Sequence, residues 1–159
     1  MVGAAEGTGS GPVALVAETV TGKIYCANRT GNSLSVIDPA AETLLVTLSA
    51  GEWPIALCAT PGRVYAANWS SGTVTVVDAL ADSVVATVPV GLQPCWVYAD
   101  SASRKVYCAD YGSGTVTVID AVSNSVVATV PVGTQPSVLC GAGDAVFSAD
   151  YGSAAVSVI

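Results

Sequence analysis

The sequence predicts an all-β fold, a β-propeller of four blades, each a four-stranded antiparallel meander sheet, with the last blade incomplete. Three observations predict it: the composition, an internal repeat, and the four strand-like segments of each repeat. Hydrophobic residues make up 52% of the 159 residues and charged residues 11%, and Val and Thr recur in dense clusters. Such a composition is typical of packed strands.

The repeat has a period of about 42 residues, a length typical of propellers. The run SGTVTVVDALADSVVATVPVGLQP, which begins at Ser71, returns at Ser113 as SGTVTVIDAVSNSVVATVPVGTQP. The same frame covers the chain, because prolines, aromatic residues and aspartates recur at matching positions. These positions are Pro12, Pro54, Pro94 and Pro136; Tyr25, Tyr65, Tyr107 and Phe147; and Asp38, Asp78 and Asp120.

Each repeat contains four strand-like segments separated by turn signals. In the third repeat these are Cys95 to Ala99, Lys105 to Ala109, Thr115 to Ile119 and Ser125 to Val132. Four short strands per repeat make a propeller blade. We therefore divide the single domain 1–159 into blades 9–51, 52–91, 92–133 and 134–159. Pro89 and Pro131 fall inside the fourth segment, and a strand interior accepts proline only at a sheet edge, so the fourth strand is expected to be outermost.

The segments Tyr25-Cys26-Ala27-Asn28, Tyr65-Ala66-Ala67-Asn68 and Tyr107-Cys108-Ala109-Asp110 look like a Tyr-Val-Thr-Asn signature. With the TVTVID and VxATVPVG runs that follow, the chain resembles the YVTN-repeat (YncE-like) β-propeller family, which grades into lactonase-like seven-bladed propellers. Cys or Ala replaces the signature Val, and Ala replaces its Thr. The resemblance implies an arc of a seven-bladed propeller and an extracytoplasmic location, periplasmic or at the cell surface.

The fourth repeat stops at Ile159, before its outer strand, and Met1–Thr8 contains no VVATVPV-like segment that would replace it. An open arc leaves two apolar blade faces uncovered. We therefore expect a fragment of a larger propeller, with self-association through the terminal blades as a possible consequence. Two arcs in an eight-bladed ring and a strained four-bladed ring are the alternatives.

Charge and residue usage exclude several classes of function. The net charge is −7 and the five basic residues are scattered, which argues against nucleic acid as a partner. No apolar run reaches the roughly 18 to 20 residues of a membrane span, and Met1–Pro12 does not read as a secretory signal. Since the chain has no histidine, the commonest general base and metal ligand is missing. We expect no cofactor, no metal site and no catalytic residue.

The five cysteines follow no metal-binding spacing. Pairs of them occupy equivalent repeat positions, and we interpret the set as small buried side chains. Disulfide pairing or a reactive thiol is the alternative. The set is Cys26, Cys58, Cys95, Cys108 and Cys140.

Strand parity places the candidate site. In a four-stranded meander, the second-to-third loop and the connection to the next blade emerge on one face, which we call the loop-rich face. Aromatic and amide side chains on it suit a sugar, peptide or protein ligand, although the aromatic residues would equally serve as caps on the blades. The expected ligand-binding residues are Arg29, Trp69, Tyr111, Tyr151, Glu52, Trp53, Gln93 and Gln135.

The sequence therefore favours a non-enzymatic binding or interaction scaffold. The alternative is a fragment of a lactonase-like or quinoprotein-like propeller enzyme whose catalytic residues lie outside this chain. Within the chain, the carboxylates that would form a metal or acid–base cluster on the loop-rich face are Glu52, Asp110 and Asp150.

Overall fold

The computed structural model describes residues 7–159, which form fifteen strands and one short 3-10 helix. The first sheet holds β1 (Pro12–Ala17), β2 (Ile24–Asn28), β3 (Ser33–Asp38) and β4 (Thr43–Ser49), and the second holds β5 (Pro54–Thr60), β6 (Arg63–Asn68), β7 (Thr73–Asp78) and β8 (Ser83–Pro89). The third holds β9 (Pro94–Asp100), β10 (Lys105–Asp110), β11 (Thr115–Asp120) and β12 (Ser125–Pro131). The fourth holds β13 (Pro136–Ala142), β14 (Ala145–Asp150) and β15 (Ala155–Val158), with the 3-10 helix η1 (Tyr151–Ser153) between the last two.

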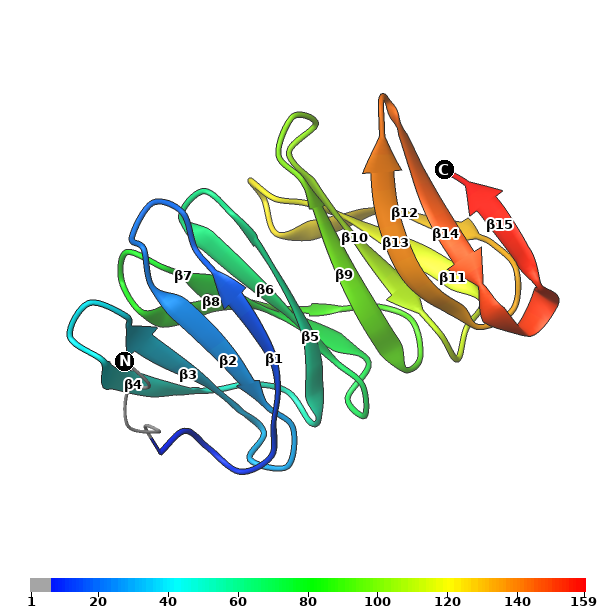
Figure 1. Cartoon of the computed structure of the whole chain (residues 1–159). Helices are drawn as coiled ribbons and strands as arrows, with labels where there is room; N and C mark the ends of the chain where they lie inside the picture. The colour runs from blue at the N-terminus through cyan, green and yellow to red at the C-terminus, as the bar shows by residue number, and fades with distance from the viewer. Residues whose placement is uncertain (1–6) are drawn as a thin grey trace.

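The four sheets stand face to face in one row (Figure 1). Each is an antiparallel meander in which sequence neighbours pair, and the last has three strands. The first strand of each sheet packs against the first strand of the next, while the fourth strands β4, β8 and β12 form the opposite edge. The structure thus confirms the predicted all-β fold, an arc of a propeller. Pro89 and Pro131 end their strands rather than lying inside them, which agrees with an edge position.

Three apolar cores fill the spaces between successive sheets. Each contains a repeat tyrosine that is buried from solvent: Tyr25 in the first, Tyr65 in the second and Tyr107 in the third. The middle strands are covered on both faces, and so four successive residues of β7 and of β11 are buried. This explains why those strands read as TVTVVD and TVTVID, dense in β-branched residues that pack well in a covered sheet.

A glycine begins the Gly-x-x-Pro segment that leads into every sheet, and close packing requires it there. A Cβ atom on Gly91 would lie 2.6 Å from the Cβ of Asp110, and one on Gly51 would lie 2.7 Å from Nδ2 of Asn68. Both distances are shorter than ordinary carbon contacts. The backbone therefore passes directly over the buried polar residue that ends the second strand.

The side chains of those buried polar residues bond to hydroxyl groups of the third strand of their own sheet; the residues are Asn28, Asn68, Asp110 and Asp150. Asn28, for example, donates from Nδ2 to the Ser35 hydroxyl (2.9 Å) on the neighbouring third strand, and the Thr117 hydroxyl donates to Asp110 (2.6 Å) in the same way. Their side chains join the second and third strands of one sheet, and these bonds offset part of the cost of burying polar groups, although Asn68 Oδ1 and Asp110 Oδ1 keep no partner.

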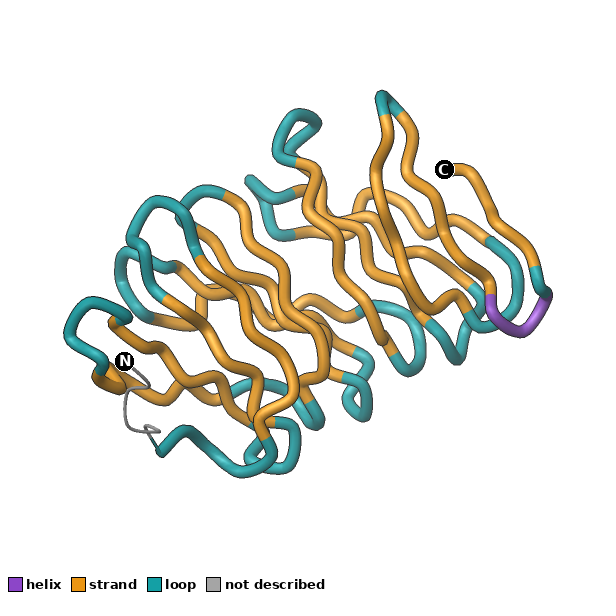
Figure 2. Tube along the Cα trace, viewed as in Figure 1, coloured by secondary structure: helices purple, strands orange, loops and turns teal. Residues whose placement is uncertain are grey.

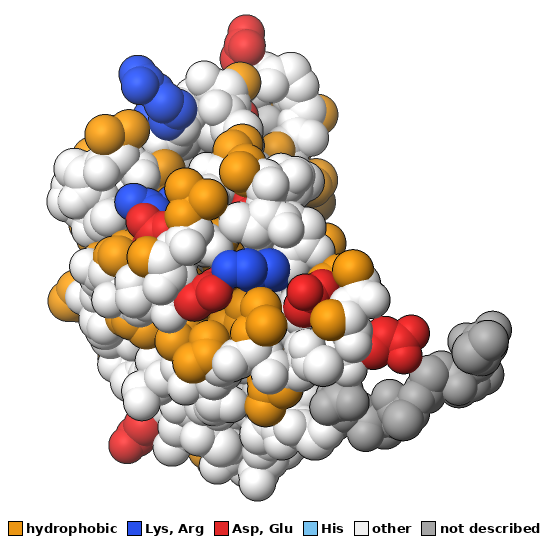
Figure 3. All heavy atoms as spheres, turned by 90° about the vertical axis from the view of Figure 1, so that its left-hand side faces the viewer, with side chains coloured by type: hydrophobic (Ala, Val, Ile, Leu, Met, Phe, Trp, Pro, Cys, Tyr) orange, Lys and Arg blue, Asp and Glu red, His pale blue; other side chains and the backbone are white. Residues whose placement is uncertain are grey.

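The two ends of the row are uncovered. On the first sheet Val13 and Leu15 of β1 are 50% and 67% exposed, and on the last sheet Val156 and Val158 of β15 are 66% and 65% exposed. The space-filling view from the side of the first sheet shows hydrophobic side chains gathered around a few charged ones (Figure 3). These are the apolar blade faces that the sequence predicts for an open arc.

All five cysteines are free thiols. Cys26 and Cys108 are buried, as expected, but Cys140 is exposed because it lies in the uncovered last sheet. Burial raises the pKa of Cys95 to about 11, which lowers the thiolate fraction and hence the reactivity of that thiol near neutral pH.

Candidate functional site

The second-to-third loops and the connections between sheets emerge on one side of the row (Figure 2, lower side). Each connection is bound to the loop of the sheet that follows it. The backbone N–H of Trp69 donates to the carbonyl of Trp53 (2.9 Å), that of Tyr111 to Gln93 (3.1 Å) and that of Tyr151 to Gln135 (3.0 Å). Six of the eight expected ligand-binding residues are thus joined in pairs through their backbones.

Three of these residues are held in the left-handed backbone region. The φ angles of Trp53, Gln93 and Gln135 are 55°, 52° and 56°. Positive φ is uncommon for side chains of this size and carries a conformational cost. The two backbone hydrogen bonds of each connection to the following loop offset that cost, and the three side chains consequently leave the connections at equivalent points.

Arg29 and Trp53 form the first contact between expected site residues. The Arg29 guanidinium carbon lies 4.3 Å from the centroid of the Trp53 ring, a cation–π geometry. The Asn32 side chain fixes the Trp53 backbone by accepting a hydrogen bond from its N–H (3.0 Å). This pair bridges the first and second sheets and leaves the tryptophan 41% exposed.

Trp69 and Tyr111 form the second contact. Their ring centroids lie 5.5 Å apart with a 40° angle between the planes, a geometry that aromatic pairs favour. Trp69 borders a depression of about 460 Å³ between the second and third sheets. The other lining residues are Ser70, Ser71, Gly72, Leu92, Gln93 and Gly112. An aromatic ring, an exposed leucine, two hydroxyls and an amide thus meet in one depression.

The remaining expected residues lie apart from this depression. Tyr151 is 76% exposed and borders a separate depression on the last sheet. Glu52 is bound through its backbone, since its carbonyl accepts from the N–H of Ser70 (3.1 Å) and its N–H donates to the Ser71 hydroxyl (3.1 Å). The expected site is therefore a series of local contacts along the arc rather than one cluster.

The structure does not bring Glu52, Asp110 and Asp150 into a cluster. Asp110 and Asp150 are each buried within their own sheet and bound to hydroxyl groups there. Burial raises the pKa of Asp110 even though the Thr115 and Thr117 hydroxyls oppose the shift. Across residues 7–159, no group of three or more His, Cys, Asp and Glu side chains is placed to hold a metal ion.

Sequence reasoning missed Trp96, which is 40% exposed on the inner strand β9. The matching positions of the other sheets, counted from the strand proline, hold Ala14, Ala56 and Val138. A tryptophan where the other repeats carry small aliphatic residues was the signal that should have singled it out.

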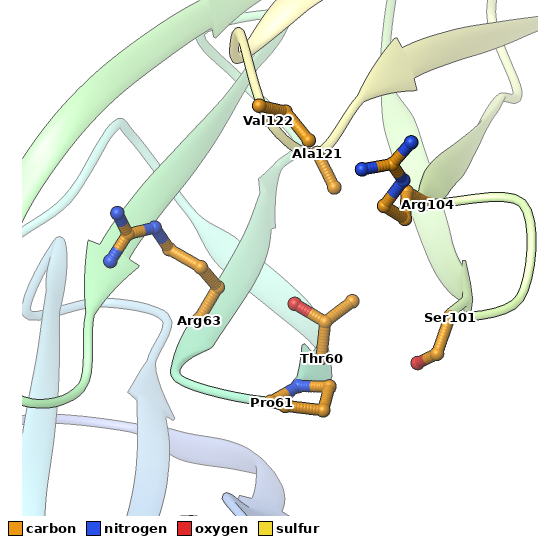
Figure 4. Close-up of a pocket in the computed structure, with 7 residues that line it drawn as sticks. All are labelled: Thr60, Pro61, Arg63, Ser101, Arg104, Ala121 and Val122. Carbon is orange, nitrogen blue, oxygen red and sulfur yellow. The ribbon is translucent and has the colours of Figure 1, made fainter.

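Sequence reasoning also missed a pocket of about 280 Å³ on the opposite side of the arc, which we call the hairpin face (Figure 4). It lies between the second and third sheets, and its lining includes Arg63 and Arg104. The sequence feature behind this pocket is the number of residues in the first turn of each sheet, which differs between repeats. A comparison of residue types at matching positions does not reveal that difference.

Comparisons with known proteins identify the fold but not a family. No protein-family model matches the sequence, and no curated protein matches it. Among solved structures, hydrazine synthase from Kuenenia stuttgartiensis matches with a TM-score of 0.77 and 18% identity over 98% of this chain and 51% of that one. Apo AztD from Citrobacter koseri matches with a TM-score of 0.64 and 17% identity over 77% of this chain and 36% of that one.

These two solved structures are β-propeller proteins, and the chain spans about half the length of the first and about a third of the second. At such identities the likeness concerns the fold alone. Within residues 7–159, no helix has the length and apolar character needed to cross a membrane.

Proposed function

We propose that this chain is a ligand-binding arc of a β-propeller, a non-enzymatic scaffold whose loop-rich face takes a sugar or a peptide segment of a partner protein. The observation that carries the proposal is the depression of about 460 Å³ beside the Trp69–Tyr111 pair. Ligand sites are concave surfaces with an apolar lining and a few placed polar groups.

The chemistry of the depression favours a neutral ligand. Its polar groups are the Ser70 and Ser71 hydroxyls and the Gln93 amide, and no charged residue lines it. Hydroxyls and amides both donate and accept hydrogen bonds, which suits sugar hydroxyls and peptide groups. The Trp69 ring and the exposed Leu92 supply apolar contact area.

The site is also preorganised. The backbone bonds of Gly112 to Leu92 (2.9 Å) and of Tyr111 to Gln93 (3.1 Å) hold both walls of the depression. Binding to a fixed site avoids the cost of ordering loops. The tilted contact between the Trp69 and Tyr111 rings, whose centroids lie 5.5 Å apart, restrains the tryptophan as well.

The test is binding of wild-type and Trp69→Ala protein to arrays of oligosaccharides and of peptides, followed by titration of each hit. Loss of a buried aromatic contact is expected to weaken binding at least tenfold. Leu80→Ala is the control, because Leu80 is 72% exposed on the hairpin face. A variant Trp69→Ala that binds every hit as tightly as Leu80→Ala, or that loses thermal stability without losing affinity, would contradict the proposal.

A further inference from the structure

The two spaces between the first three sheets are built from equivalent positions, but only one of them is closed on the hairpin face. Between the first and second sheets, the buried carboxylate of Glu18 accepts a hydrogen bond from the N–H of Gly62 in the next sheet (2.9 Å). Lys23 forms an ion pair with Asp82 of the next sheet (2.6 Å). The Tyr25 hydroxyl also donates to Asp82 (3.3 Å). Two carboxylates thus close this space.

The repeat supplies the counterparts of these groups between the second and third sheets. Thr60, the last residue of β5, takes the place of Glu18 when both are counted from the strand proline. Arg63 takes the place of Lys23, and Tyr65 that of Tyr25. Asn124 takes the place of Asp82, since each is the fourth residue after a strand-ending aspartate and has positive φ. Both carboxylates of the closed space are therefore replaced by neutral side chains.

A cation is added at the same place. The carbonyl of Gly62 accepts from Ala79 (3.1 Å) and that of Arg104 accepts from Ala121 (3.0 Å), which makes Gly62 and Arg104 equivalent. The Arg104 side chain extends toward Ala121 and Val122, whereas the Arg63 side chain points away and pairs with Asp78 of its own sheet (Figure 4). Arg104 is thus the pocket cation that has no carboxylate within ion-pairing distance among the described residues.

Two further buried polar atoms of the second and third sheets remain without partners, on residues that do not themselves line the pocket. The hydroxyl of Tyr65, a residue with no solvent exposure, lies near Thr60 but outside hydrogen-bonding geometry. The side-chain oxygen of Asn124 is also buried and unpaired. Their counterparts Tyr25 and Asp82 bond to each other. Unpaired buried polar atoms are rare in folded proteins and call for an explanation.

We propose that the pocket between the second and third sheets on the hairpin face binds a small organic carboxylate. The bound carboxylate group takes the place that the Glu18 carboxylate holds between the first two sheets, accepting hydrogen bonds from the Arg104 guanidinium and the Thr60 hydroxyl. The volume of about 280 Å³ lies near the lower end of small-molecule sites, so the ligand is a compact acid rather than a polymer.

The acidic neighbours of the pocket do not oppose this assignment. The Asp78 carboxylate accepts from Arg63 and from the N–H of Leu80 (2.9 Å). The Asp120 carboxylate accepts from the N–H groups of Val122 (2.9 Å) and Ser123 (2.8 Å). Hydrogen bonds from Ser123 and Val122 lower the pKa of Asp120, and the charge of the nearby Arg104 lowers it further. Arg104 nevertheless forms no ion pair with it, and a guanidinium is suited to a planar carboxylate through paired N–H donors.

The experiment is a titration of ¹⁵N-labelled protein with sodium succinate and with sodium acetate, followed by NMR. Sodium chloride at matched ionic strength measures non-specific screening. We expect saturable shifts of the Arg104 and Thr60 resonances with the two carboxylates and none with chloride. Shifts of the same size with chloride, or shifts spread over all basic residues, would overturn the proposal.

Variants separate the pocket from general charge. Arg104→Gln is expected to raise the dissociation constant about tenfold or more, since a hydrogen bond to a charged group is lost. Lys105→Gln removes the same charge at the next residue, outside the pocket lining, and is expected to change it less than twofold. Thr60→Glu places a carboxylate of the chain itself in the pocket and is expected to abolish binding. Equal effects of Arg104→Gln and Lys105→Gln, or unimpaired binding by Thr60→Glu, would refute the assignment.

Discussion

Glu18 joins the first two sheets through a carboxylate whose removal should have a pH-dependent cost. It is fully buried and accepts four hydrogen bonds, from the N–H groups of Val20 (2.8 Å), Thr21 (2.8 Å) and Gly62 (2.9 Å) and from the Thr21 hydroxyl (2.7 Å). Burial by itself raises the pKa of Glu18, but these bonds outweigh it and lower the pKa from 4.5 to about 2. We therefore predict that Glu18→Gln destabilises the fold.

The magnitude follows from the difference between the two pKa values. When a carboxyl group has a lower pKa in the folded chain than in the unfolded chain, its ionised form stabilises the fold. The stabilisation is about 1.4 kcal/mol for each pH unit between the two pKa values. Between 4.5 and about 2 this is about 3 kcal/mol, and screening by water at the rim of the sheets reduces it to about 2 kcal/mol. The contribution is complete above pH 4.5 and disappears as the pH falls through 2.

Urea unfolding of wild-type and Glu18→Gln protein between pH 7 and pH 2 measures this contribution. The free energies of unfolding should differ by about 2 kcal/mol at pH 7, and the difference should shrink steadily below pH 4.5. Glu42→Gln, which alters an exposed carboxylate of the same sheet, is the control and should change stability by less than about 0.5 kcal/mol. A difference that stays constant with pH, or a Glu18→Gln variant as stable as Glu42→Gln, would refute the reasoning.

Three further predictions concern the arc itself. Gly91→Ala is expected to cost about 1 to 3 kcal/mol, because the new Cβ would lie 2.6 Å from Asp110 Cβ, whereas Gly7→Ala, with no atom within 4 Å, should be neutral in the same thermal melts. Asp110→Asn should raise the free energy of unfolding at pH 7, because burial raises the pKa of Asp110 and its ionised carboxylate weakens the fold as the pH rises above 3.8. Urea unfolding at pH 3 should show no such gain. Sedimentation should give a mass above the 15.8 kDa of one chain, because the two terminal faces are apolar. Leu15→Lys should shift the measured mass toward that of the monomer. A wild-type protein that stays monomeric at high concentration would contradict this prediction.

The fold was predictable because the repeat fixes strand number and strand order together. Near-identical runs from Ser71 and Ser113 place four strands per repeat, and a meander follows once consecutive strands are joined by short turns. The incomplete last sheet was readable in the same way, from the sequence that stops after a third strand. The recurrence of the strand-ending aspartates has a local cause, since Asp78 and Asp120 accept bonds from backbone N–H groups two and three residues later.

The roles of the buried Asn and Asp residues were not predictable from residue type. Asn68 and Asp110 end their second strands at positions that read as turn starts, and such side chains often bond to nearby backbone. Their actual partners are hydroxyls five and seven residues later, across the hairpin, on Thr73 and Thr75 or on Thr115 and Thr117. Only the register of the second strand against the third brings these groups together.

The repeats keep the loop lengths constant on one face of the arc and let the turn lengths vary on the other. On the loop-rich face every second-to-third loop and every connection between sheets has four residues, so the loop length is constant from sheet to sheet and the sequence differences lie mainly in the side chains. On the hairpin face the first turn of each sheet has six, two, four and two residues in order, so the space between neighbouring sheets varies as well. Residue comparison therefore found the aromatic residues of the first face and overlooked the pocket of the second. The long turn after β1 begins with Glu18, whose carboxylate accepts a hydrogen bond from Gly62 of the next sheet. The short turn 61–62 leaves the corresponding space open beside Arg104.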